Sequence, residues 1–596
     1  MKKIMLLVIL IILFPVAYAK EGHITLLAVK EVDSGLEGST ADLSLEIKSG
    51  SGRVFLDTFP LTKMDTQIST RFAKEIACDY IDFDCNRYDF IFTITADSTI
   101  IGGPSAGAAA TMLAISLLQD ISLDKSTAIT GTINSGGLIG PVGGVKAKID
   151  AASKSGIKKV LIPKGERFIE SEPELAITNN TIAINLSQAN ETLDLVEYGK
   201  KSNIVVVEVS DINDVIYEFT GKKIKEPEEG LVIDEEYQNT MNSLALMLCN
   251  RSNYLETELS KYPLRNEEMI GVKESAINLT KKADMAYKNN SYYSSASYCF
   301  GANVKYSYLI SFAQNQTKEK IAKEIDSARK RISEFNDRLS KKKKKTITDL
   351  EVYAVVKERL IEADYYLNSS SDDDNLYNLA YATERISSAD SWMRFFDNRG
   401  KRFDLDKDVI KKLCQKKLSE AEERYQYVNL FFPAALEDTK RGIDYAYSDL
   451  GSENYELCIF KASQAKAEAD VILSTVGIEK SQLDELIGQK MNAAKRNIIS
   501  QTKKGIFPIV GYSYYEYAND LKQTDKYSAL IYLEYALELS NLDIYLKEEA
   551  KEKKEISYHF DRTAVYLFIS GILIGFLIAV SLKRRKQKAK KHRKKH

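Results

Sequence analysis

A serine on a glycine-rich turn and a lysine 43 positions later are the residues of this chain whose types and spacing could do chemistry. Ser105 lies within Gly-Gly-Pro-Ser-Ala-Gly (residues 102–107), and Lys148 ends Gly-Gly-Val-Lys-Ala-Lys (residues 143–148). A serine hydroxyl attacks a carbonyl only when a base takes its proton, and a lysine serves as that base only where its surroundings keep it neutral. The pair therefore predicts a serine–lysine hydrolase site.

The elements that must position these two residues can be predicted from local pattern. An apolar run over residues 106–118 predicts a helix that begins at the serine, and residues 145–155 predict a second helix that carries the lysine. A third helix is expected over residues 67–78. Strands are expected over four further runs: residues 23–29, 90–94, 128–133 and 159–163. The alternation predicts a mixed α/β region over residues 22–221.

The composition changes after an acidic linker, which we place at residues 222–231. From residue 232 to residue 558 the chain is rich in Ala, Tyr, Lys and Glu at helical spacing and has very few prolines. A weak repeat restarts at a tyrosine after each polar turn, and the restarts are Tyr293, Tyr377, Tyr455 and Tyr527. Their shrinking intervals favour irregular helical hairpins or a bundle over a strict solenoid. Whether this region binds a ligand or only forms a bundle stays open.

Two apolar segments predict an exported chain anchored in a membrane. Residues 1–19 have a charged start, a short apolar stretch and a small-residue end, which is typical of a signal peptide; an uncleaved anchor is the alternative. Residues 564–582 are uncharged and long enough to span a bilayer as one helix. The basic tail at residues 583–596 is then expected in the cytoplasm, and most of the chain outside the cell membrane.

The formal net charge of −1 hides two parts of opposite sign. The tail holds ten Lys or Arg and no acid, and together with Lys2 and Lys3 it leaves −13 for the segment between. This separation of charge is not typical of a nucleic-acid-binding protein, so no nucleic-acid partner is expected. The expected partners are polypeptide substrates, unfolded or in exposed segments, and the membrane; a homo-oligomer stays open.

Six cysteines form three neighbouring pairs along the sequence, namely Cys78 with Cys85, Cys249 with Cys299, and Cys414 with Cys458. In an oxidising compartment these neighbours could form disulfides. Spacing alone does not fix their connectivity, so buried free thiols remain the alternative.

Several blocks of the sequence resemble the proteolytic domain of Lon-family serine proteases. The blocks are Ile-Gly-Gly-Pro-Ser-Ala-Gly (101–107), Ala-Ile-Thr-Gly-Thr-Ile (128–133), Gly-Pro-Val-Gly-Gly (140–144), Lys148, and Val-Leu-Ile-Pro (160–163). Within the family they look most like the exported branch that lacks an ATPase, which would suit an archaeal surface. The resemblance implies the family's α/β (α+β) proteolytic fold over residues 22–221 and a serine endopeptidase. No Gly-x4-Gly-Lys-Ser/Thr phosphate loop occurs in the sequence, so ATP-independent activity is expected.

The resemblance also implies roles for single residues. Ser105 matches the family's nucleophile and Lys148 its general base, whereas Lys146 matches a lysine that is not catalytic. Thr130 matches the threonine whose hydroxyl orients the lysine amine. Backbone N–H groups around Gly103 and Ser105 are expected to form the oxyanion hole. Neither a metal ion nor a cofactor is implied.

Two positions depart from the pattern of many Lon proteases. Gly102 stands three residues before the serine where many carry an acid, and Thr132 follows Thr-Gly where many carry Glu. Both residues suit the exported branch. They keep a second class open: a cell-surface binding or scaffold protein whose Lon-like domain is inactive or processes only its own chain.

Overall fold

The computed structural model describes residues 20–546 except for short gaps. The gaps are residues 33–34, 82, 102, 171–174, 179–180, 185–191, 224–234, 316, 369–374, 397–399, 430–431, 433–434, 476–477 and 479. The signal peptide predicted at 1–19, the membrane helix predicted at 564–582 and the basic tail at 583–596 all lie outside the described residues, as does most of the predicted linker. Within the described ranges, no helix combines the length and the apolar character needed to cross a membrane.

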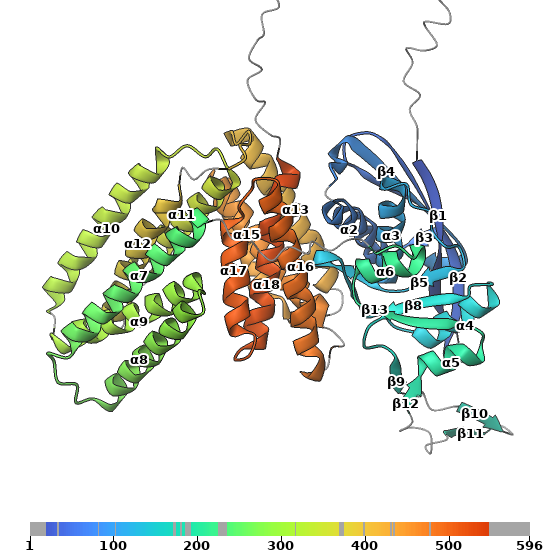
Figure 1. Cartoon of the computed structure of the whole chain (residues 1–596), viewed down its shortest axis with the longest axis horizontal. Helices are drawn as coiled ribbons and strands as arrows, with labels where there is room; N and C mark the ends of the chain where they lie inside the picture. Colours follow the sequence, from blue (N-terminus) through green and yellow to red (C-terminus); the bar gives the residue numbers. More distant parts are fainter. Residues whose placement is uncertain are drawn as a thin grey trace, which may run out of the picture. The chain divides into compact units, whose positions relative to one another are not determined.

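A seven-stranded mixed sheet forms the centre of the N-terminal α/β region (Figure 1). Its strands, in spatial order, are β13 (Val205–Val209), β8 (Lys159–Pro163), β5 (Thr127–Ile129), β1 (Lys20–Val32), β2 (Gly35–Ser49), β4 (Tyr88–Ile101) and β3 (Val54–Thr62). Strands β1, β2 and β4 pair antiparallel, whereas β13, β8, β5 and β1 form a parallel run and β3 is parallel to β4. On β1, Leu26 and Leu27 enter different cores, so both faces of the sheet are covered.

Helices pack on the two faces of this sheet. Helices α2 (Met64–Tyr80), α3 (Gly107–Leu118) and α6 (Ile212–Thr220) share one core with β2 and β4, and α4 (Val145–Lys154) and α5 (Leu195–Lys201) share the other with β8. Helix α3 is buried on nearly every side, which explains why its sequence is apolar throughout and not amphipathic. The helix that begins at the candidate nucleophile is thus held firmly inside the core.

The smaller elements of this region lie at its edges. Strands β6 (Thr132–Asn134) and β7 (Leu138–Gly140) form a hairpin around the 3-10 turn η3 (Ser135–Gly137). The remaining elements are η1 (Cys85–Arg87), η2 (Pro104–Ala106), β9 (Phe168–Glu170), β10 (Leu175–Thr178), β11 (Thr181–Ile184) and β12 (Thr192–Asp194).

The single strand predicted over residues 128–133 is wrong, because the structure splits it into β5 and β6. At the break, the N–H of Gly131 donates to the Ser105 carbonyl at 3.1 Å, and the Gly131 carbonyl accepts from the N–H of Ala108 at 3.1 Å. These bonds to the serine turn replace the hydrogen bonds of a continuous strand. A Cβ at Gly131 would lie 2.5 Å from the Ile139 side chain, so any larger residue there would force that side chain to move.

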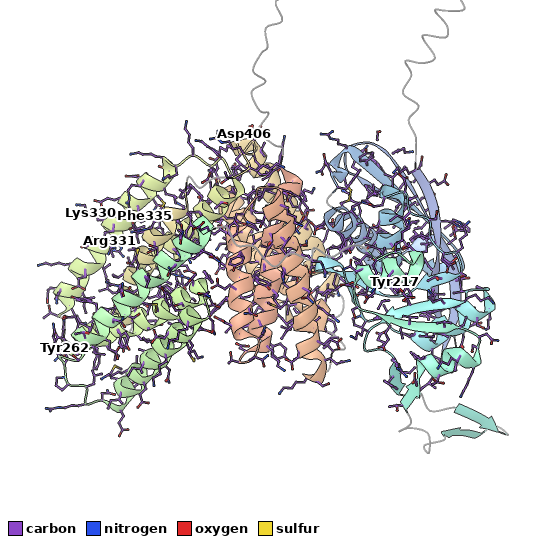
Figure 2. All side chains as sticks on the ribbon, viewed as in Figure 1. Tyr217, Tyr262, Lys330, Arg331, Phe335 and Asp406 are labelled. Carbon is purple, nitrogen blue, oxygen red and sulfur yellow. A yellow bond between two sulfur atoms is a disulfide. The ribbon has the colours of Figure 1, made fainter. Side chains whose placement is uncertain are left out.

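The second half of the described chain is helical, as expected. Its helices are α7 (Glu235–Leu259), α8 (Glu267–Lys288), α9 (Tyr292–Ala313), α10 (Lys318–Ser340), α11 (Ile347–Asn368), α12 (Asn375–Trp392), α13 (Lys407–Asn429), α14 (Glu437–Gly451), α15 (Tyr455–Thr475), α16 (Leu483–Lys503), α17 (Ile509–Leu521) and α18 (Lys526–Ser540). Short 3-10 turns follow at η5 (Met393–Phe395), η7 (Lys480–Gln482) and η8 (Leu542–Tyr545). On α10, Phe335 is buried in a core whereas Lys330 and Arg331 are exposed (Figure 2).

The tyrosines of the weak repeat fall in the first turns of four of these helices. Tyr293, Tyr377, Tyr455 and Tyr527 begin α9, α12, α15 and α18, and each of these helices packs on the helix before it. The repeat in the sequence therefore corresponds to the second helix of a hairpin. Its spacing drifts because the hairpins differ in helix length.

The α/β and helical regions belong to one compact unit, which ends at Lys547. Polar contacts join them: Lys466 Nζ lies 2.8 Å from Glu75 Oε1, and the Asn541 side-chain amide donates to Asp79 at 2.9 Å. Ser135 of η3 donates a hydrogen bond to Glu534 of α18. Contacts to α2 and η3 therefore hold the helical region against the α/β region.

Three disulfides cross-link neighbouring cysteines. Cys78–Cys85 closes the end of α2, Cys249–Cys299 joins α7 to α9, and Cys414–Cys458 joins α13 to α15. Cross-links that close loops of this size typically stabilise a fold by about 2–4 kcal/mol.

Replacing Lys490 with Met should destabilise the protein strongly. Lys490 on α16 and Glu534 on α18 form an ion pair in which both side chains are completely buried. The substitution leaves the Glu534 charge buried without its cation, and such losses cost about 3–5 kcal/mol. The free energy of unfolding, measured by chemical denaturation, checks this. Lys407→Met, in the exposed Lys407–Glu453 pair, is the matched control and should change little; equal effects of the two substitutions would contradict the prediction.

Candidate active site

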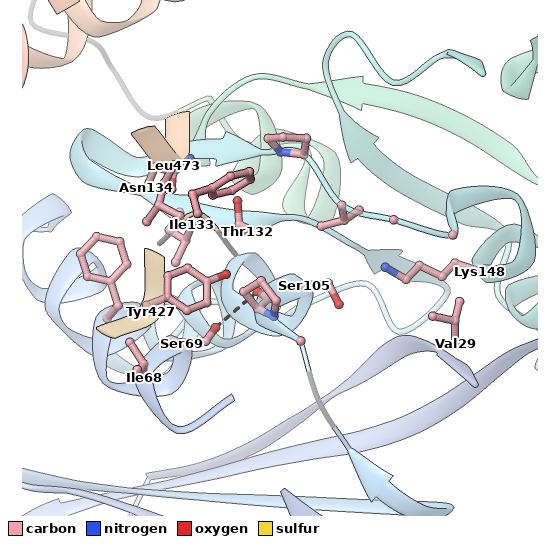
Figure 3. A pocket seen from close by; sticks show the side chains of 18 of the residues that line it. Val29, Ile68, Ser69, Ser105, Thr132, Ile133, Asn134, Lys148, Tyr427 and Leu473 are labelled. Atoms are coloured by element: carbon pink, nitrogen blue, oxygen red, sulfur yellow. Dashed lines mark hydrogen bonds between the residues drawn. The ribbon is translucent and has the colours of Figure 1, made fainter. Parts of the chain in front are cut away.

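Ser105 and Lys148 line the same cavity, which has a volume of about 390 Å³ (Figure 3). Their side chains point into the same part of it. The η2 turn supplies Ser105, and the first turns of α4 supply Lys148. The residues that the sequence pairs over 43 positions are thus brought together by the fold.

The turn that carries Ser105 is set by backbone geometry. Gly103 has φ +103°, a conformation that side-chain-bearing residues rarely adopt, although a side chain there would meet open space. The Ser69 hydroxyl donates to the Pro104 carbonyl at 3.4 Å, and Gly131 holds the Ser105 carbonyl. Ser105 therefore stands at the N-terminus of α3, where the helix dipole favours negative charge. Gly102 lies outside the described residues.

The two lysines of α4 occupy different environments. Lys148 is 2% exposed, whereas the Lys146 side chain is half-exposed. Lys146 pairs with Asp150 at 3.5 Å and lies 4.9 Å from the centre of the Tyr198 ring. Burial lowers the pKa of Lys146, but the hydrogen bond with Tyr198 and the charge of Asp150 outweigh it and raise the pKa overall. Lys146 is therefore a protonated surface residue.

The net shift of the pKa has the opposite sign at Lys148. Removal of the ammonium from water lowers the pKa of Lys148 to about 8, against the opposing charge of Glu166. A substantial fraction of this amine is then neutral in mildly alkaline solution. That is the condition under which a lysine can act as a base.

Glu166 interacts electrostatically with Lys148, and sequence reasoning missed it. One of its carboxylate oxygens accepts a hydrogen bond from the Val142 N–H at 2.6 Å, and the other is buried with no hydrogen-bond partner among the described residues. Burial raises the pKa of Glu166 to about 7, and the Val142 bond and the Lys148 charge oppose this. The residue follows β8 by three positions, and no local pattern shows that it faces α4.

Replacing Glu166 with Gln should move the pH dependence of activity to lower pH. The carboxylate charge raises the pKa of Lys148, so its removal lowers that pKa, while the amide oxygen still accepts from Val142. Activity that needs a neutral amine rises with pH through the pKa of Lys148, with a midpoint near 8 in the native protein. The pH profile of kcat/KM measures the shift. The exposed Glu197→Gln is the control, and an unmoved midpoint in Glu166→Gln would contradict the expectation.

Thr130 lies at the end of β5 and is almost completely buried. Its N–H donates to the Leu161 carbonyl at 3.0 Å. Its hydroxyl has no hydrogen-bond partner among the described residues, and an unpaired buried hydroxyl is costly. Thr130 is not one of the residues that line the cavity.

The helical region contributes part of the cavity wall, which the sequence did not indicate. Arg424 and Tyr427 come from α13, Phe432 follows that helix, and Leu473 comes from α15. These residues lie more than 250 positions from the lysine, so no spacing pattern could connect them to the site.

Part of this chain, which includes the cavity's serine and lysine, matches known proteins. Residues 74–196 match the model of the Lon protease (S16) C-terminal proteolytic domain, and both Ser105 and Lys148 fall inside that segment. This part of the chain is therefore similar to the proteolytic domain of Lon proteases.

Individual relatives match parts of the chain as well. The Lon protease of Phenylobacterium zucineum is 44% identical over 84 residues, which are 14% of this chain and 11% of that protein. The archaeal Lon proteases of Methanothermobacter thermautotrophicus and Archaeoglobus fulgidus are 30% identical over 140 residues and 35% identical over 128 residues. These matches cover 23% and 21% of this chain and 21% and 20% of the relatives. The chain thus spans only about a fifth or less of the length of these relatives.

Proposed function

We propose that the chain is a serine endopeptidase in which Ser105 is the nucleophile and Lys148 is the general base. The observation that carries the proposal is that a serine at a helix N-terminus and a buried lysine line one cavity of a Lon-type proteolytic domain. Lys146, exposed and paired with Asp150, is excluded as the base by its protonated state.

The proposed reaction has two halves. Neutral Lys148 accepts the proton of the Ser105 hydroxyl, and the serine oxygen bonds to the carbonyl carbon of the substrate peptide. N–H groups of the turn at Gly103 and Ser105 stabilise the oxyanion, and the lysine then protonates the leaving amine as the peptide bond breaks. Water, deprotonated by Lys148, hydrolyses the acyl-enzyme. The unpaired Thr130 hydroxyl is proposed to hold the lysine amine in position.

The proposal also includes the place and energy source of the reaction. We infer an ATP-independent enzyme outside the cell membrane, attached by the helix expected at residues 564–582. The three disulfides support this placement, because disulfides persist in oxidising compartments. The sequence supports ATP independence, since it contains no phosphate loop.

Active-site labelling of the purified full-length protein tests the proposal. A fluorophosphonate should modify the native chain stoichiometrically, and mass spectrometry should place the adduct on Ser105. Heat-denatured protein is the control and should not react, because an unactivated serine hydroxyl is a weak nucleophile. Absence of an adduct on the native chain would favour the alternative of an inert scaffold.

A further inference from the structure

The wall that the helical region adds to the cavity lies outside the segment that matches Lon proteases. Tyr427 and Leu473 line the cavity together with Phe72 of α2 and Ile133 of β6. Figure 3 shows Tyr427 near Ile68 and Ser69, and Leu473 near Asn134. The cavity is therefore completed by side chains from two regions of the chain.

Fixed contacts hold this wall in place. The Arg424 guanidinium lies 2.7 Å from Asp470 of α15, and both side chains are buried. The same guanidinium lies over the Phe72 ring, 3.5 Å from its centre. One turn before Asp470, Lys466 pairs with Glu75 of α2. Helices α13 and α15 are thus bound both to each other and to α2, which also lines the cavity.

The chemistry of the lining determines what the cavity can accept. Of the described residues around it, only Lys148 and Arg424 have side chains that can carry a charge near neutral pH. Arg424 is 5% exposed, and its guanidinium contacts Asp470 and the face of the Phe72 ring, so its charge is partly offset inside the protein. The rest of this end is mostly apolar, with Phe72, Ile133, Tyr427, Phe432 and Leu473 beside the uncharged polar residues Ser69 and Asn134. Such a surface favours a large apolar side chain over a charged or small one.

We propose that the helical region completes a specificity subsite, in which Tyr427 and Leu473 bind a large aromatic or aliphatic side chain of the substrate close to the scissile bond. The inference rests on the proposed function, since it assumes that Ser105 attacks a peptide. The helical region then determines which peptides are cleaved. The Lon-type segment alone supplies the reacting groups.

Kinetics with a matched peptide series on the full-length protein test this subsite. Quenched fluorescent peptides that differ only at the residues flanking the cleaved bond (Ala, Leu, Phe or Asp) give the ratio of kcat/KM for Phe to that for Ala. We expect the native ratio to exceed about tenfold, and Tyr427→Ala or Leu473→Ala to reduce it by about tenfold. Leu473→Phe narrows the cavity and should shift the preference toward Ala. Tyr527→Ala, an exposed tyrosine of α18, is the control and should leave the ratio unchanged.

The outcomes separate this inference from the proposed function. Fluorophosphonate labelling of Ser105 in each variant shows that the variant is folded with an intact site. Labelled variants whose Phe-to-Ala ratio stays native, including Leu473→Phe, would overturn the subsite while leaving the protease assignment intact. If the native protein neither cleaves the peptides nor takes the label, the proposed function is overturned, and the subsite with it.

Discussion

Replacing Ser105 with alanine should abolish peptide cleavage. The substitution removes the only atom that would bond to the substrate, and in enzymes of this kind loss of the nucleophile lowers kcat by a factor on the order of 10⁴ to 10⁶. The fold should persist, because the Ser105 backbone carbonyl, which anchors the turn, is kept by the substitution. Initial rates on an unstructured polypeptide, with circular dichroism of the same samples, measure both expectations.

Ser153→Ala provides a matched control for the serine. Ser153 lies on α4 close to Lys148 in sequence, and its exposed hydroxyl donates to the Ser202 carbonyl at 3.1 Å. The control should retain native activity. Cleavage that survives in Ser105→Ala, with the same fragments as in the native protein, would disprove the nucleophile assignment.

Replacing Lys148 with Met should have an effect of similar size. Methionine fills the buried space but cannot accept a proton, so kcat should fall by a factor on the order of 10⁴. Lys146→Met, two residues away on the same helix, should retain most of the activity, because Lys146 is half-exposed and paired with Asp150. If Lys146→Met were inactive and Lys148→Met active, the general base would be Lys146.

The stability of Lys148→Met shows whether the variant is inactive because it lacks the base or because it is unfolded. The pKa of Lys148 is lowered to about 8 by burial, so below pH 8 the folded state holds a buried cation at a cost that the unfolded chain does not bear. Stability should therefore rise as pH increases from about 8 toward the ordinary lysine value of 10.5. Lys148→Met removes this cost and should be more stable than the native protein at pH 7. Thermal unfolding midpoints at pH 7 check the sign.

Local patterns predicted the parts of the fold that are decided locally. The apolar run at 106–118 becomes α3 (Gly107–Leu118) and the run at 159–163 becomes β8, because burial on all sides requires continuous apolar sequence. Gly103, two residues before Ser105, is likewise favoured by its own backbone conformation, because its φ is positive. These features need no information from distant residues.

The features that sequence reasoning missed depend on distant partners. The break at Thr130–Gly131 arises because the Gly131 backbone bonds to the serine turn, which lies 26 residues earlier. Glu166 accepts a hydrogen bond from Val142, 24 residues earlier, and Tyr427 enters the cavity from another region of the chain. Each is a contact between segments whose local patterns are ordinary, so only the folded arrangement shows it.

The disulfide between Cys414 and Cys458 restrains the part of the cavity wall that the helical region supplies. It joins α13 to α15, the two helices that carry Tyr427 and Leu473. A reductant that opens this cross-link removes a covalent restraint on the cavity wall without touching Ser105 or Lys148. Comparing the Phe-to-Ala ratio with and without a reductant would measure the effect. A changed ratio would show that this buried cross-link contributes to the proposed substrate preference.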